Sequence, residues 1–200
     1  IDLSQGTPVD QTPQFIQDAF SSASNSPSYP VVAGTASLKD AIRKWSVENL
    51  GVTGDFDVLP TIGSKEFIAL LPTFLQSKSV LYPKVAYPTY LVSAMMASAQ
   101  ATPVDIDASI WPKADLAWLN SPSNPTGQVQ TDQELKACIS WARKNQAILA
   151  SDECYLSFAK DAKSILALAN GNNTGLLAVL SLSKRSNLAG YRAGFVVGDS

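Results

Sequence analysis

The sequence has 200 residues, of which 46% are hydrophobic and 16% are charged, and its formal net charge is −2. This composition is typical of a globular chain with a sizeable buried core, and it excludes a disordered chain, a basic nucleic-acid-binding surface and a membrane-spanning segment. The chain contains no histidine, which excludes Ser-His-Asp triads, Cys-His dyads and histidine-based zinc sites within these residues.

The N-terminal part of the chain combines a polar arm with a first amphipathic helix. Residues 1–35 are rich in Pro, Ser and Thr and predict an arm with one short helix over residues 12–23. Apolar residues then recur at helical spacing from Ser37, and Gly51 ends the helix. The residues that define this apolar face are Leu38, Ala41, Ile42 and Trp45.

Short strands and further helices alternate along the rest of the chain. The strand candidates are residues 57–62, 79–82, 104–106, 116–120, 147–151 and 176–182. Helices are predicted after Gly63 and from Thr131, which forms a capping-box pattern with Glu134. This alternation predicts an α/β fold with a mostly parallel sheet that is covered by helices on both faces.

Polar clusters lie at four of the predicted strand ends. They are residues 63–66, 120–127, 152–155 and 181–184. Ligands of open α/β sheets bind outside the carboxyl ends of the strands. We therefore expect these clusters to meet in one site.

The last cluster carries the most specific motif. Residues 181–194 read SLSKRSNLAGYRAG, which resembles the SxSKxxNxxGxRxG stretch of fold-type I pyridoxal-phosphate enzymes. A desolvated lysine at a strand end can act as a nucleophile. The resemblance implies that Lys184 binds pyridoxal 5′-phosphate covalently and that Ser181 and Arg192 contact the phosphate.

Two other motifs extend the resemblance. Residues 120–127 read NSPSNPTG and residues 151–155 read SDECY, as in the NPTG and SDExY motifs of the family. The resemblance implies that Asn124 binds the 3-oxygen of the cofactor ring and that Tyr155 donates to the same oxygen. It assigns Asp152 to the ring nitrogen, whose protonated form a carboxylate stabilises.

The remaining cofactor contacts are expected at the start of a helix and after a strand. Gly63 permits close backbone approach, and a helix N-terminus at Ser64 and Lys65 suits a phosphate group. In the family these positions contact the cofactor phosphate. Tyr87 aligns with the aromatic residue that stacks on the pyridine ring.

The resemblance also assigns roles to the N-terminal arm. Tyr29 aligns with a tyrosine that reaches the phosphate of the neighbouring subunit, which implies a homodimer, and Gly6 lies in a loop that closes over substrate. Residues 1–35 are thus expected to form the arm and substrate loop, and residues 36–200 the cofactor-binding large domain. Family members are longer, so the small C-terminal domain and its carboxylate-binding arginine are expected to be missing from this sequence.

The implied activity is that of an aminotransferase acting on small amino acids and keto acids. Three stretches, residues 29–35, 61–66 and 183–195, are most similar to actinobacterial N-succinyl-diaminopimelate aminotransferases, which use glutamate in lysine biosynthesis. Alternatives are an aspartate or aromatic aminotransferase, a C–S lyase, or a non-catalytic cofactor-sensing domain of a transcriptional regulator. The two cysteines lack CxxC spacing and no secretory leader is visible, so a cytoplasmic location is expected.

Other large or charged residues are expected to be structural. Glu153 points away from Asp152 in an extended segment, and Tyr90 is expected to serve packing. The residues expected in the core are Trp45, Trp111, Trp118, Trp141, Met95 and Met96.

Overall fold

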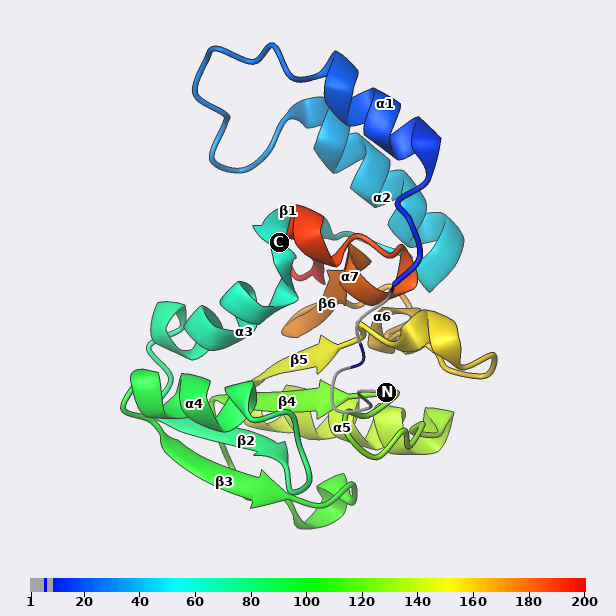
Figure 1. Ribbon diagram of the computed structural model, residues 1–200. Coiled ribbons are helices and arrows are strands. Elements are labelled where there is room, and N and C mark those ends of the chain that lie inside the picture. The colour runs from blue at the N-terminus through cyan, green and yellow to red at the C-terminus, as the bar shows by residue number, and fades with distance from the viewer. Residues whose placement is uncertain (1–5, 7–8) are drawn as a thin grey trace.

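The computed structural model describes residue 6 and residues 9–200. Its centre is a seven-stranded sheet in the order β1-β7-β6-β5-β4-β2-β3 (Figure 1). The strands are β1 (Asp57–Ile62), β2 (Ser79–Pro83), β3 (Gln100–Val104), β4 (Leu116–Asn120), β5 (Ile148–Asp152), β6 (Leu176–Ser181) and β7 (Ala193–Gly198). Strands β3, β2, β4, β5 and β6 are parallel, whereas β7 is antiparallel to both of its neighbours. The expected α/β fold with a mostly parallel sheet is confirmed.

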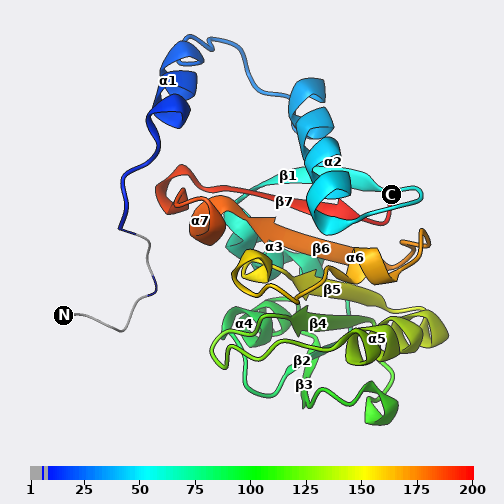
Figure 2. The same cartoon turned by 90° about the vertical axis from the view of Figure 1, so that its right-hand side faces the viewer.

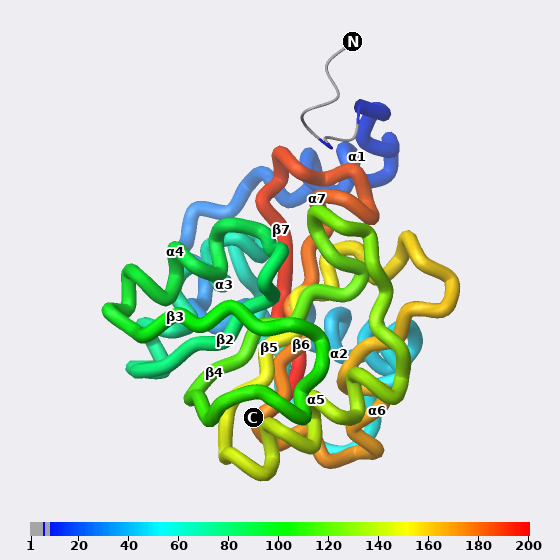
Figure 3. The backbone as a smooth tube through the Cα atoms, turned by 90° about the horizontal axis from the view of Figure 1, so that it is seen from below, coloured from blue at the N-terminus to red at the C-terminus, as the bar shows by residue number. Residues whose placement is uncertain are grey.

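Helices cover both faces of the sheet (Figures 2 and 3). The helices that follow the N-terminal arm are α2 (Ala36–Leu50), α3 (Gly63–Phe74), α4 (Thr89–Met96), α5 (Asp132–Asn145), α6 (Ile165–Leu168) and α7 (Leu182–Arg185). Helix α1 (Gln14–Ser22) belongs to the arm, has no buried residue and lies away from the sheet (Figure 2). A hydrophobic cluster lies on each face of the sheet. Successive residues of β4 contribute to different clusters, because neighbouring side chains of a strand point to opposite faces. Trp118 packs in the cluster under α3 and α4, and Leu119 packs in the cluster under α2, α5 and α6.

The predicted capping box is present at the start of α5. The Thr131 hydroxyl accepts from the backbone N–H of Glu134 at 3.3 Å, and the Glu134 carboxylate accepts from the backbone N–H of Thr131 at 2.7 Å. Two orphan donors of the helix are thereby satisfied. The buried face of α5 includes Leu135, Cys138, Ile139 and Ala142.

Helix α2 begins and ends close to the predicted positions, but its buried face is rotated. Thr35 caps its first turn and Gly51, with φ of 67°, follows its last residue. The buried residues are Ile42, Ser46 and Leu50. The predicted face was wrong for Leu38 and Ala41, which are exposed, because the helix contacts the sheet mainly through its C-terminal half.

Two other predictions were wrong. The strand expected at residues 104–106 lies at Gln100–Val104, where it pairs with β2 from Ser79 onward. Met95 and Met96 are 66% and 56% exposed rather than buried. Helix α4 turns Tyr90 and its i+3 and i+4 neighbours toward the sheet, so both methionines point outward.

The sheet topology determines where ligands can approach. After β2 the chain runs outward to β3 and returns to β4 on the other side of β2, so β2 and β4 flank a topological switch point. At the opposite side, β1 pairs with β7 in a register that places Ile62 opposite Ala193. Among the described residues, no helix has the length and apolar character required to cross a bilayer.

Candidate active site

A cavity of about 480 Å³ lies at the C-terminal ends of the parallel strands. It is lined by Gly6, Ser64, Lys65, Tyr87, Asn124, Asp152, Cys154, Tyr155, Ser181, Ser183, Lys184, Ala189 and Arg192. The structure therefore brings together residues from all four polar clusters, as their positions at strand ends predict. Of the expected site residues, Gly63 and Tyr29 do not line this cavity.

Asp152 forms the buried acidic group of the cavity. It is the last residue of β5 and is 5% exposed. Its Oδ2 accepts a 2.8 Å hydrogen bond from the Tyr90 hydroxyl, and its Oδ1 accepts from the backbone N–H of Cys154 at 3.1 Å. Burial raises the pKa of Asp152, and these hydrogen bonds oppose that rise.

Tyr90 does more than the packing expected of it. Its ring is fully buried and stacks on Trp118, with a centroid distance of 5.3 Å, while Tyr87 meets it edge-on at 5.9 Å. Burial, followed by the neighbouring Asp152, raises the pKa of Tyr90 far above its usual value. The hydroxyl therefore stays protonated and remains a donor to Asp152.

Asn120 connects the ends of β4 and β5. Its side-chain amide donates to the backbone oxygen of Asp152 at 2.9 Å, and its Oδ1 accepts from the backbone N–H of Asn124 at 2.6 Å. These two contacts fix the loop that carries Asn124 relative to Asp152. On the same side of the cavity, burial raises the pKa of Tyr155, so its hydroxyl is a donor at neutral pH.

Three cationic side chains surround the same cavity. Lys184 lies in α7, and its Nζ donates to the backbone oxygen of Gly6. Arg192 adopts a left-handed backbone conformation and donates to the backbone oxygen of Ala189 at 2.8 Å. Within the described part of the chain, no carboxylate forms an ion pair with Lys65, Lys184 or Arg192. The cavity is therefore suited to an anion.

Gly63 lies directly against Arg192, one of these three cationic side chains. Its φ is 68°, and a Cβ atom at this position would collide with the guanidinium of Arg192. Ser64 follows it in the first turn of α3, where unpaired backbone N–H groups favour an anion. Ser181 caps α7 by accepting from the backbone N–H of Ser183 at 3.1 Å.

Of the two site residues expected in the N-terminal arm, Gly6 lies at the cavity and Tyr29 does not. Gly6 lines the cavity through its contact with Lys184, whereas Thr7 and Pro8 of the same loop lie outside the described residues. Tyr29 is fully exposed and does not reach the cavity of its own chain. Its expected contact with a neighbouring subunit stays a prediction.

Tyr90 and Cys154 were not assigned to the site from the sequence. Both had a recognisable signal. Cys154 stands two residues after Asp152, so an extended backbone places both on one side. Tyr90 stands three residues after Tyr87, in the first turn of α4, and its backbone N–H donates to the Tyr87 carbonyl.

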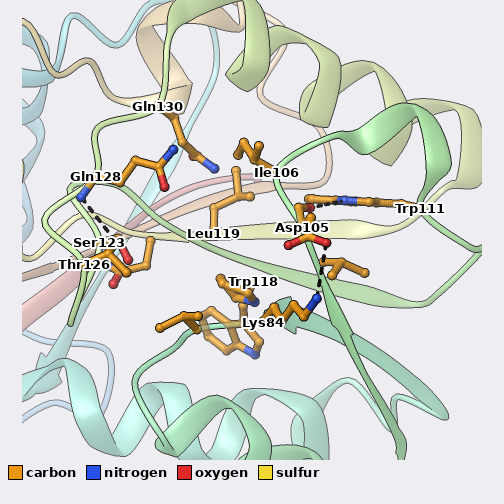
Figure 4. A pocket seen from close by; sticks show the side chains of 14 residues that line it. Lys84, Asp105, Ile106, Trp111, Trp118, Leu119, Ser123, Thr126, Gln128 and Gln130 are labelled. Atoms are coloured by element: carbon orange, nitrogen blue, oxygen red, sulfur yellow. Dashed lines mark hydrogen bonds and ion pairs between the residues drawn. The ribbon is translucent and has the colours of Figure 1, made fainter.

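A second cavity, of about 160 Å³, is lined by residues at the ends of β2 and β4, among them Pro83 and Leu119 (Figure 4). Trp111, Trp118 and Leu119 supply much of its apolar lining, and Lys84 faces Asp105 across 3.8 Å. This ion pair is largely exposed, and the cavity lacks the buried carboxylate and the cluster of cations. The chemistry therefore points to the larger cavity.

The chain matches the family model described as aminotransferase class I and II over residues 1–200. It is 44% identical over 208 residues to 4-dedimethylamino-4-oxo-anhydrotetracycline transaminase OxyQ of Streptomyces rimosus, and this match covers 100% of the chain and 58% of that protein. It is 46% identical over 209 residues to the probable aminotransferase Rv1178 of Mycobacterium tuberculosis, covering 100% of the chain and 50% of that protein.

A solved structure with the same fold is that of a probable N-succinyldiaminopimelate aminotransferase from Thermus thermophilus. The two are 30% identical with a TM-score of 0.87, and the match covers 100% of this chain and 59% of the other. The chain thus spans about half the length of the curated relatives that it matches.

Proposed function

Because the chain belongs to aminotransferase class I and II, an enzyme family that depends on pyridoxal 5′-phosphate, we propose that the whole protein transfers an amino group between an amino acid and a keto acid at the larger cavity. The observation that carries this proposal is the convergence of a lysine, a buried carboxylate and a cationic end on one cavity. These are the groups that the chemistry of this cofactor requires.

The charged groups of the cavity fit both ends of pyridoxal phosphate. The doubly charged phosphate needs hydrogen-bond donors and cations, which we assign to Ser64, Lys65, Ser181 and Arg192. The protonated ring nitrogen needs a carboxylate, which we assign to Asp152. Since Asp152 is buried and its oxygens already accept two hydrogen bonds, its carboxylate is held in a fixed position in the cavity.

Residues from three further segments would complete the cofactor site, Gly63 at the phosphate end and the others around the ring. Gly63 lets the backbone and Arg192 approach each other closely. Tyr87 offers an aromatic face for stacking. Asn124 and Tyr155 supply donors for the 3-oxygen, in keeping with the raised pKa of Tyr155.

Lys184 is proposed as the catalytic nucleophile and as the group that moves the proton. When bound, the cofactor supplies an electron sink for the electron pair released at the substrate α-carbon. With its amine free of the cofactor, Lys184 would accept the α-proton of the substrate as a general base and later donate it as a general acid. The Gly6 carbonyl holds the Lys184 Nζ beside the proposed substrate loop.

We propose that glutamate is the amino donor and that the keto acid corresponding to N-succinyl-diaminopimelate is the acceptor, which would place the enzyme in lysine biosynthesis. The reverse reaction takes N-succinyl-diaminopimelate and 2-oxoglutarate. The likeness to the Thermus thermophilus structure supports this choice. A bulkier ketone is the second candidate, because the OxyQ relative is named as the transaminase of an anhydrotetracycline. The two substrates differ enough in size and charge for direct competition to separate them.

The proposal extends to the assembly and the domains. Residues 1–35 are proposed as the arm and substrate loop, and residues 36–200 as the cofactor-binding large domain. The exposed Tyr29 is proposed to reach the phosphate in the second subunit of a homodimer. A cytoplasmic location belongs to the same proposal, since both cysteines are buried and unpaired in the structure.

The first test compares the visible absorption spectra of the full-length wild-type protein and its Lys184→Ala variant after addition of pyridoxal phosphate. We expect a borohydride-reducible band in the wild type that is absent from the variant. Succinylated diaminopimelate with 2-oxoglutarate should then yield glutamate. Release of ammonia without a keto-acid acceptor would indicate a lyase, and absence of the band from both proteins would contradict the proposal.

A further inference from the structure

The thiol of Cys154 lies between two groups for which different roles are proposed above. Its Sγ is 3.2 Å from Ser64 Oγ, and its backbone N–H donates to Asp152 Oδ1. The residue is 9% exposed and lines the larger cavity. Cys154 therefore connects the phosphate end of the cavity with the buried carboxylate.

In the contact with Ser64 the Cys154 thiol is the donor, which requires the thiol to be protonated. Burial, followed by the nearby Asp152 carboxylate, raises the pKa of the Cys154 thiol well above its usual value. The sulfur therefore carries its single hydrogen at neutral pH. A thiol offers one weak donor, whereas a serine hydroxyl offers one donor and two acceptor positions.

Two acceptors lie within reach of that hydrogen, the Ser64 hydroxyl and the Asp152 carboxylate. Each Asp152 oxygen already accepts a hydrogen bond, one from Tyr90 and one from the Cys154 backbone. Among the described residues, the contact of the thiol that has hydrogen-bond geometry is the one to Ser64 Oγ, at 3.2 Å. When the thiol donates to Ser64, the hydrogen of Ser64 itself must point to a different acceptor.

The Ser64 hydroxyl lies where an anion would supply that acceptor. It belongs to the first turn of α3, whose N-terminus favours negative charge. Lys65 and Arg192 line the same cavity. A phosphate oxygen bound there would accept the hydrogen of the Ser64 hydroxyl, which is not used in the contact with the thiol.

We propose that Cys154 is a positioning residue that donates to Ser64 Oγ and so directs the Ser64 hydroxyl as a donor to the cofactor phosphate. This inference rests on the proposed function, because it requires pyridoxal phosphate in the cavity. It predicts that Cys154 strengthens binding of the phosphate group and has no effect on binding of the pyridine ring.

The test measures the dissociation constants of pyridoxal 5′-phosphate and of pyridoxal, which lacks the phosphate, in the full-length protein. Cys154→Ala removes the donor, and Cys154→Val removes it while keeping the volume filled. In both variants we expect pyridoxal phosphate to bind about three- to tenfold more weakly, the range for one hydrogen bond, with pyridoxal binding unchanged. As a control, Cys138→Ala replaces a fully buried cysteine in the hydrophobic cluster under α2, α5 and α6. It should change neither dissociation constant.

A Ser64→Ala background separates the two residues further. If Cys154 acts through Ser64, then Cys154→Ala should have no additional effect on pyridoxal phosphate binding there. Equal losses for both ligands, no loss for either, or an undiminished loss in the Ser64→Ala background would each overturn the inference while leaving the proposed function intact. Failure of the wild type to bind pyridoxal phosphate would instead overturn the proposed function and this inference with it.

Discussion

The Tyr90 hydroxyl donates a 2.8 Å hydrogen bond to Asp152 Oδ2 between two side chains that are both buried. Tyr90 comes from the first turn of α4 and Asp152 from the end of β5. The contact therefore links a helix that covers the sheet to the carboxylate at its edge. It reduces the energetic cost of keeping an ionised carboxylate away from water.

Replacing Tyr90 by Phe should leave Asp152 Oδ2 without this partner. We expect a loss of about 1–3 kcal/mol in the free energy of unfolding, the usual effect of an unsatisfied buried acceptor. The pKa of Asp152 should rise further, which weakens its interaction with a protonated ring nitrogen. Urea denaturation and pyridoxal phosphate titration measure the two effects, with Tyr82→Phe as a control on the same face of the sheet. Equal behaviour of the two variants would contradict this prediction.

Gly63→Ala should weaken binding of pyridoxal phosphate through Arg192. Both Gly63 and Gly51 have positive φ, 68° and 67°, but an added Cβ would collide with Arg192 only at Gly63. Each alanine variant should lose about 1 kcal/mol of stability through backbone strain. Only Gly63→Ala should also raise the dissociation constant of pyridoxal phosphate, by roughly tenfold or more, since a charged hydrogen bond contributes about 1.5–3 kcal/mol. Parallel effects of both variants on cofactor binding would exclude the steric explanation.

Glu153 should make the protein less stable as the pH rises. Burial raises its pKa to about 7, so the folded state retains a proton that the unfolded state releases near its ordinary pKa of 4.5. Stability is therefore highest below that ordinary value and falls as the pH approaches and passes 7, by on the order of 3 kcal/mol in total. Glu153→Gln should be more stable than the wild type at pH 8, with a smaller difference at pH 5. Urea midpoints measured at four values of pH would test this, and parallel curves would contradict it.

Thr131→Ala should destabilise the protein without affecting the site. It removes the side-chain acceptor of the capping box at the start of α5, which contributes about 1 kcal/mol. Thermal unfolding should register the loss, whereas titration with pyridoxal phosphate should not. Weaker cofactor binding in this variant would mean that α5 affects the cavity.

Local signals in the sequence were sufficient for most of the fold. The strands that end in Asn120 and Asp152 are short apolar runs followed by polar residues, and the α5 cap is a two-residue pattern. Strand β7 was not predicted, because its residues belong to a Gly-rich motif and it becomes a strand only between β6 and β1. The buried side of α2 was similarly unpredictable, since it depends on the angle at which the helix meets the sheet.

The candidate site was predictable as a set of residues but less so as a set of contacts. The motifs identified Lys184, Asp152 and Asn124, and these residues line one cavity. The donors that fix Asp152 are the Tyr90 hydroxyl and the Cys154 backbone N–H. Spacing could bring these residues to the site, but it could not show that they donate to Asp152. Tyr90 illustrates this point, because only the tertiary structure shows that its ring packs while its hydroxyl serves the carboxylate.

The pairing of β1 with β7 has a consequence for how the site is assembled during synthesis. The register that places Ile62 opposite Ala193 also brings Gly63 beside Arg192, although one follows the first strand and the other precedes the last. The segment up to Asp152 is therefore synthesised before Arg192, the residue that contacts Gly63. Such distant pairings form late in folding, because the intervening loop must be closed first. Nascent chains are accordingly expected to acquire the anion-binding end of the cavity only after β7 has left the ribosome.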